Sequence, residues 1–135
     1  MASSINVMQK TIDYWIEESA EALQVAGHLF EKKDYSYALF FGHLAVEKML
    51  KANYVARTGE HAPQIHNLVR LAEKTGLSLS AERKDVLNRI TAFNLEARYP
   101  DEKRSFRLRC TEQFTSTELS NIREILQWLK SIMKS

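Results

Sequence analysis

Residues that break helices are rare in this chain. Its 135 residues include only four glycines and two prolines, and both prolines, Pro63 and Pro100, fall in stretches typical of loops. Many short strands would need many turns rich in Gly and Pro, so this scarcity favours long helices. The apolar fraction of 44% is ordinary for a globular protein and sufficient for a hydrophobic core. We therefore expect an all-α fold.

Apolar residues recur every three or four positions along most of the chain, which is the spacing of a buried helix face. The pattern predicts four long helices and one short helix. The long ones are expected over residues 5–31, 35–57, 81–93 and 115–134, and the short one between residue 68 and Gly76. The sequence therefore predicts one domain, residues 1–135, folded as an up-and-down helical bundle of about five helices with the short helix at the side.

Two boundaries in the second half of the chain are less definite. Residues 94–110 read as irregular, because Pro100 disfavours helical geometry at the residue before it. The last helix could begin at Thr115 in a capping box with Glu118, or one turn earlier near Thr111.

The segment of residues 35–57 is apolar on almost every side. A helix of this kind is buried on more than one side, so it is either the centre of a bundle or part of a subunit interface. Surplus apolar surface tends to be covered by a partner, and we therefore expect a homodimer.

Charge is distributed unevenly along the chain, although the formal net charge is only +2. Residues 1–31 are mainly acidic, whereas residues 98–109 are mainly basic and contain Tyr99 and Phe106. RNA-binding surfaces combine cations for phosphates with rings that stack on bases. The alternative is a solvated loop anchored by Phe106.

The sequence also favours a reducing compartment. Cys110 is the only cysteine, so it cannot form a disulfide within the chain, and we expect a buried structural thiol. The first ten residues lack the apolar core of a signal peptide, and no stretch is apolar enough to span a bilayer. His61 and His66 lack the further ligands that zinc needs. We expect a cytoplasmic protein without membrane contact, metal or cofactor.

Three short motifs resemble the HEPN domain family, in particular small prokaryotic members associated with MNT-type nucleotidyltransferases. The motifs are ALFFGHLAVEKMLKA at residues 38–52, HNLVRLAEKTG at residues 66–76 and ARYPD at residues 97–101. The resemblance implies a nucleotide- or RNA-associated binding module. It also implies a homodimer that acts with a small nucleotidyltransferase partner, as in a toxin–antitoxin pair.

Some HEPN proteins are ribonucleases with an Arg-x(4–6)-His motif near the start of the last long helix. Here no histidine follows His66, and Arg57 precedes His61 and His66 at the wrong spacings. The resemblance therefore does not extend to that motif, and no catalytic residue is assigned. Two alternatives stay open. One is a ribonuclease toxin with a degenerate site at Arg98 and Tyr99 or in the basic segment, and the other is a structural interaction protein without a ligand.

Polar residues at positions 43, 47 and 51 follow the i, i+4, i+8 spacing of one helix stripe. This stripe could line a phosphate-binding groove that Arg98 and Tyr99 approach, or it could be a solvated face with a Glu–Lys pair. The candidate ligand-binding residues are His43, Glu47, Lys51, Arg98, Tyr99, Arg104 and Arg107.

Overall fold

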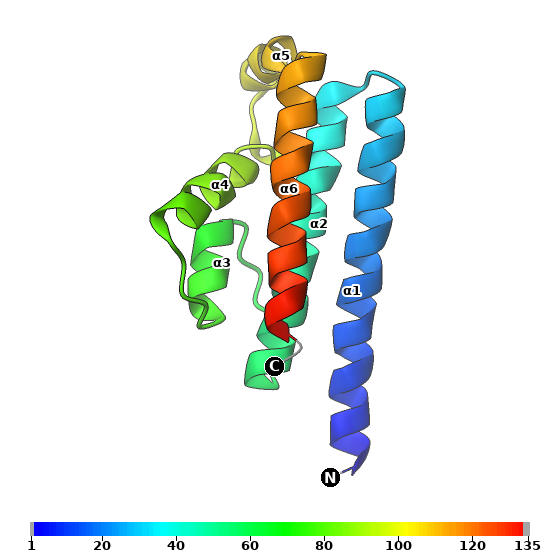
Figure 1. Ribbon diagram of the computed structural model, residues 1–135, viewed down its shortest axis with the longest axis vertical. Coiled ribbons are helices and arrows are strands. Elements are labelled where there is room, and N and C mark those ends of the chain that lie inside the picture. The colour runs from blue at the N-terminus through cyan, green and yellow to red at the C-terminus, as the bar shows by residue number, and fades with distance from the viewer. Residues whose placement is uncertain (1, 134–135) are drawn as a thin grey trace.

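The computed structural model describes the backbone of residues 2–133 and the side chains of residues 8–133. This part of the chain is helical and contains no strand (Figure 1). Its elements are α1 (Ala2–Glu31), α2 (Tyr35–Thr58), α3 (Leu68–Lys74), α4 (Ala81–Thr91), the 3₁₀ helix η1 (Leu95–Ala97), α5 (Pro100–Arg109) and α6 (Glu112–Met133). The expected all-α bundle is confirmed, and no described helix is long and apolar enough to cross a membrane.

Three long helices run side by side, with α2 between α1 and α6 (Figure 1). The short connection between α1 and α2 makes them antiparallel neighbours. Lys33 adopts the left-handed conformation there, with φ of 67°, and the backbone N–H of Asp34 donates to the carbonyl of Leu29 at 2.8 Å. From the other end of α2 the chain returns through α3 and α4, and α5 lies across the end where α6 begins.

Helix α2 is the centre of the bundle, because α1, α3, α4, α5 and α6 all contact it. Leu39, Ala45, Val46 and Leu50 are fully buried against these neighbours. The apolar arc of this helix is thus covered within one chain. It packs tightly against α6 at Gly42, where an added Cβ would lie 2.7 Å from Cδ1 of Ile122.

Helices α3 and α4 begin at side-chain caps. Asn67 Oδ1 accepts from the backbone N–H of Arg70 at 2.9 Å, and Ser80 Oγ accepts from that of Arg83 at 3.1 Å. Although α3 lies to one side of the bundle, it contributes fully buried residues to the core. These are Leu68, Leu71 and Ala72.

Residues 94–110, expected to be irregular, contain η1 and α5, so the described chain has six α-helices and not five. Proline is favourable at the first position of a helix, and Pro100 takes that place while Tyr99 stays extended in front of it. Acidic residues in the first turn of α5 and arginines in the last turn match the helix dipole. Phe106, which is 1% exposed, anchors the helix to the core.

The last helix begins at the earlier of the two expected positions. Thr111 Oγ1 accepts from the backbone N–H of Phe114 at 3.1 Å, and α6 starts at Glu112. Thr115 and Glu118 therefore lie inside the helix. Glu118 is buried and accepts from Arg89 Nε of α4 at 3.1 Å, which joins α4 to α6.

Candidate functional site

The carboxylate of Glu47 is the centre of a polar cluster on α2. Its Oε1 lies 3.7 Å from Nε2 of His43 and 3.7 Å from Nδ1 of His66, and its Oε2 lies 3.5 Å from Nζ of Lys51. His43 is 1% exposed and Glu47 is 8% exposed. The structure thus brings the three stripe residues together and adds His66 from the loop before α3.

His43 is held as a neutral ring. Its Nδ1 lies 3.3 Å from the carbonyl oxygen of Phe40, so this nitrogen carries the hydrogen and donates it. Burial lowers the pKa of His43 below its ordinary value of 6.5, and it outweighs the nearby carboxylates of Glu47 and Glu96, which act in the opposite direction. The lone pair of Nε2 then faces Oε1 of Glu47, and neither atom has a hydrogen-bond partner among the described residues.

Lys51 lies between a carboxylate and an aromatic ring. Besides Glu47, its Nζ lies 4.9 Å from the centroid of the Trp15 ring on α1. A cation over the face of a tryptophan is attracted by the ring and stabilises the contact between the helices. The stripe therefore joins α1, α2 and the loop before α3 in one network, in which His43 and Glu47 are buried and the His66 side chain is exposed.

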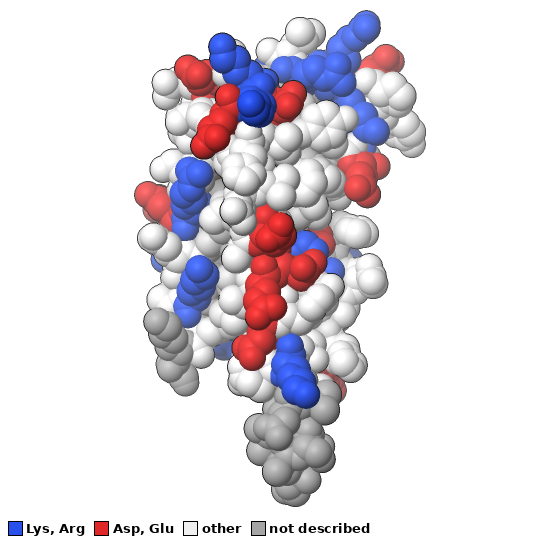
Figure 2. All heavy atoms as spheres, turned by 90° about the vertical axis from the view of Figure 1, so that its right-hand side faces the viewer, with Lys and Arg blue, Asp and Glu red and all other residues white. Residues whose placement is uncertain are grey.

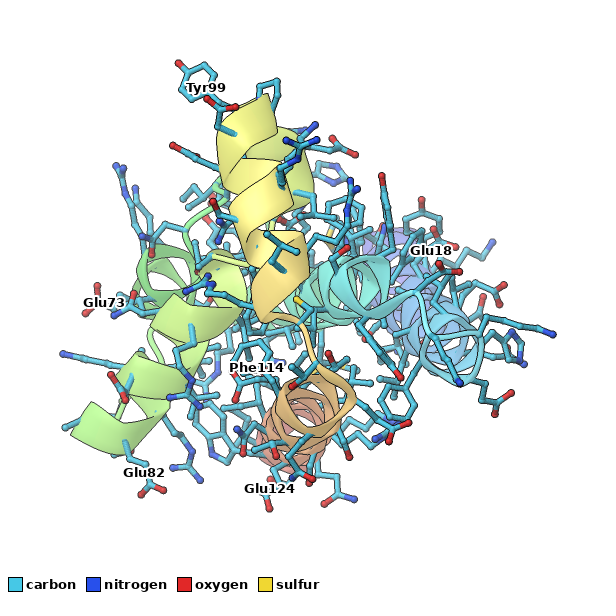
Figure 3. The ribbon with its side chains drawn as sticks, turned by 90° about the horizontal axis from the view of Figure 1, so that it is seen from above. Glu18, Glu73, Glu82, Tyr99, Phe114 and Glu124 are labelled. Carbon is cyan, nitrogen blue, oxygen red and sulfur yellow. The ribbon has the colours of Figure 1, made fainter. Side chains whose placement is uncertain are left out.

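Arg98 and Tyr99 point elsewhere. Arg98 donates through Nε and Nη2 to the carbonyl of Ala92 at the end of α4, and its Cζ lies 4.6 Å from the centroid of the Phe106 ring. Tyr99 is 77% exposed, and Figure 3 shows it at the outer end of α5, directed away from the bundle. The structure shows neither of them in contact with the stripe.

Helix α5 carries exposed cations. Lys103, Arg104 and Arg107 are exposed, and within residues 8–133 their side chains form no ion pair or hydrogen bond. Figure 2 shows Lys and Arg side chains gathered at the α5 end of the molecule, with a few acidic ones among them, and acidic side chains in a column along the α1 face. The acidic and basic segments of the sequence thus lie at different places on the folded molecule, the acidic one along α1 and the basic one at the α5 end.

A pocket of about 450 Å³ lies between the α1–α2 connection and the last turn of α5. Most of its lining was not predictable from the sequence, because the pocket joins two segments separated by about seventy positions. Its lining residues are Lys33, Asp34, Tyr35, Ser36, Tyr37, Arg107 and Cys110. Burial raises the pKa of the Cys110 thiol to about 11, which fits the expected structural thiol.

The described side chains contain no group of three or more His, Cys, Asp or Glu arranged to hold a metal ion. The α5 cations and the adjoining pocket are two features that can meet a ligand.

Comparison with known proteins identifies the family and the fold of the chain. A model of the HEPN domain matches residues 12–132. The crystal structure of TT1696 from Thermus thermophilus has a TM-score of 0.75 and 20% sequence identity, over 89% of this chain and 96% of TT1696. At that identity the likeness shows a shared fold. No curated protein matches the chain. Since the family model spans most of the sequence and the helical bundle agrees with it, the chain belongs to the HEPN domain family.

Proposed function

We propose that this HEPN domain binds a nucleotide or RNA at the end of the bundle that carries α5. The observation that supports this function is the set of exposed α5 cations without partners among the described side chains, Lys103, Arg104 and Arg107. Such cations can neutralise phosphates without first breaking an internal ion pair. Tyr99 beside them exposes a ring on which a base can stack.

The test is binding of a fluorescent single-stranded RNA to a variant with Lys103→Ala and Arg104→Ala. We expect affinity to fall roughly tenfold and the slope of log K against log salt to decrease in magnitude by about 1.4, since each phosphate contact contributes about 0.7 for single strands. The matched control is Lys10→Ala with Arg123→Ala, which removes two exposed cations from α1 and α6. Equal losses in both variants would indicate attraction by net charge alone, and the α5 site would be discarded.

The partner of the module is also part of the proposal. Membership of the family and the three sequence motifs support a homodimer that works with an MNT-type nucleotidyltransferase, as in a toxin–antitoxin pair. The neighbouring open reading frame tests this. A partner gene should encode a Gly-Ser-x-x-x-Gly sequence with paired aspartates, and its product should co-purify with this chain.

The geometry favours a binding module over a degenerate ribonuclease. One form of that alternative uses Arg98 and Tyr99, and there Arg98 is held by the carbonyl of Ala92 and the ring of Phe106. A guanidinium engaged in this way connects η1 to α4 and α5 and acts as a structural contact.

A further inference from the structure

The pocket at the α1–α2 connection has the size and the lining of a ligand site. Its volume of about 450 Å³ lies within the roughly 300–1,000 Å³ typical of small-molecule sites. It adjoins the α5 cations through Arg107, and it lies apart from the buried network around Glu47. Its walls are tyrosines, cations and the first turn of a long helix.

The first turn of α2 presents free donors to this pocket. Backbone N–H groups at the start of a helix have no partner within the helix. Here the N-cap residue Asp34 makes no side-chain capping hydrogen bond, so it does not satisfy them. The first intrahelical bond runs from the N–H of Ala38 to the carbonyl of Asp34. The pocket wall thus contains the backbone N–H donors of Tyr35, Ser36 and Tyr37. The positive end of the helix dipole lies there too.

Ser36 adds a hydroxyl to the pocket. The residue is 6% exposed and lines the pocket, and its hydroxyl forms no hydrogen bond with any described residue. Its Oγ is not one of the described buried atoms that lack a partner, so it is open to the pocket and not sealed in the core. A ligand oxygen in the pocket can accept the hydrogen that Ser36 otherwise donates to solvent.

Two cations complete the wall. Lys33 and Arg107 both line the pocket, and neither side chain forms an ion pair within the described part of the chain. Lys33 has a left-handed backbone with φ of 67°, which glycine adopts more easily. Lys33 thus lines the pocket from a strained backbone position.

The carboxylate of Asp34 restricts the chemical class of the ligand further. Asp34 also lines the pocket, and its carboxylate repels an anion but accepts from hydroxyl donors. A ribonucleotide offers both groups, namely a phosphate for Lys33, Arg107 and the helix N-terminus, and ribose hydroxyls for Asp34. A terminal phosphate, with a charge of about −1.5 to −2 near neutral pH, gains more from two cations than an internal phosphodiester does.

We infer that this pocket binds the terminal phosphate of a ribonucleotide, either a free 5′-mononucleotide or the 5′ end of an RNA strand. The inference rests on the proposed function, since it names the group that the module recognises. The α5 cations then contact the strand that follows the terminal phosphate.

The experiment compares two RNA oligomers of one sequence, one with a 5′-phosphate and one with a 5′-hydroxyl. Wild-type protein should bind the phosphorylated strand roughly tenfold more tightly, as expected for one charge-assisted contact. Lys33→Gly should abolish this preference and should not lower the melting temperature, since glycine relieves the strained φ. Ser36→Ala should reduce the preference. Lys103→Ala with Arg104→Ala should weaken both strands alike and keep the preference.

Cys110 provides a second readout, because it is the only thiol of the chain and lines this pocket. Adenosine 5′-monophosphate should slow its reaction with a neutral thiol reagent, whereas adenosine should not. Protection by the mononucleotide identifies a free nucleotide as sufficient, and protection by phosphorylated RNA alone identifies a strand terminus.

Equal affinity for the two strands, without protection of Cys110 by either phosphate compound, would overturn the inference. If RNA binding still depends on Lys103 and Arg104 in that case, the proposed function stands without this pocket. If neither strand binds but the mononucleotide protects Cys110 in wild-type protein and not in Lys33→Gly, the pocket stands and the RNA function fails.

Discussion

Glu47 joins segments of the chain that are distant in sequence. Its carboxylate contacts His43 and Lys51 on its own helix and His66 on the loop before α3. The i, i+4, i+8 spacing predicted that the stripe residues share a helix face. It could not predict their burial or the contacts of His66 and Trp15, because those depend on which segments pack over that face.

The neutral state of His43 leads to a prediction for stability against pH. Below pH 6.5 the unfolded chain protonates this histidine, whereas the folded protein resists protonation because its pKa is lowered. The unfolded state then binds more protons, so the free energy of unfolding should fall as pH falls from 6.5 towards the folded pKa. Urea melts between about pH 5 and 7.5 measure this fall.

The variant His43→Asn tests the assignment. Asparagine keeps an N–H donor for the carbonyl of Phe40 but does not titrate, so the fall in stability between pH 6.5 and the folded pKa should become shallower. His61→Asn, in an exposed loop position, is the control and should keep the wild-type slope. A slope unchanged in His43→Asn would mean that other groups around the cluster, such as Glu47, His66 or Glu96, produce the pH dependence.

At the scale of the elements, the seam between α2 and α6 depends on a missing side chain. Replacing glycine by alanine inside a helix normally stabilises it by about 1 kcal/mol. At Gly42 the new methyl would lie 2.7 Å from Cδ1 of Ile122 and 3.5 Å from Cδ2 of Leu119. Both are buried, and overpacking costs about 1–3 kcal/mol. We therefore expect Gly42→Ala to lower the free energy of unfolding by up to about 2 kcal/mol.

Two comparisons separate packing from helix propensity in the same denaturation experiment. Gly27→Ala in α1, where nothing lies within 4 Å of the added Cβ, should stabilise the protein. Gly42→Ala should cost less in an Ile122→Val background, because valine lacks the δ-methyl that is approached. Stabilisation by Gly42→Ala in the wild-type background would show that the Ile122 side chain or the helix itself moves aside at little cost.

Helix α5 shows where local sequence signals were ambiguous. Proline ends one helix or begins another with the same fixed φ, so Pro100 alone could not distinguish a loop from a helix start. The deciding contact is the burial of Phe106 against Phe93, whose ring centroids are 5.7 Å apart. That contact joins α5 to the segment after α4, and periodicity within either segment does not reveal it.

At the scale of the whole molecule, the all-α bundle was predictable because helical periodicity persists through most of the chain and few residues interrupt it. The central position of α2 was one of two alternatives, and packing by its neighbours within the chain selects it. The pocket at the α1–α2 connection was not predictable, since it requires α5 to lie across the end of the bundle.

The proposed homodimer is a prediction at this scale. An apolar groove of about 360 Å³ lies beside α1 and α6 and is lined by Ile12, Ile16 and Met133, among others. A helix from a second copy would cover these side chains and complete a four-helix arrangement around the groove. Light scattering should give twice the chain mass of 15.6 kDa at micromolar concentration, and Ile16→Glu should give the monomer mass.

The control for the dimer is Tyr14→Glu, at an exposed position of the same helix. It should leave the measured mass unchanged. A wild-type mass of one chain would remove the dimer from the proposal, and a dimer that persists in Ile16→Glu would move the interface to another face.

The three-residue connection between α1 and α2 has a consequence for the order of folding. Loop closure costs entropy that grows with the length of the loop. Docking α1 against α2 closes a loop of only residues 32–34, whereas docking α2 against α6 closes a loop of residues 59–111. The antiparallel pair of α1 and α2 therefore has the lowest entropic barrier to docking, and we expect it to form the early nucleus on which α6 later closes the core.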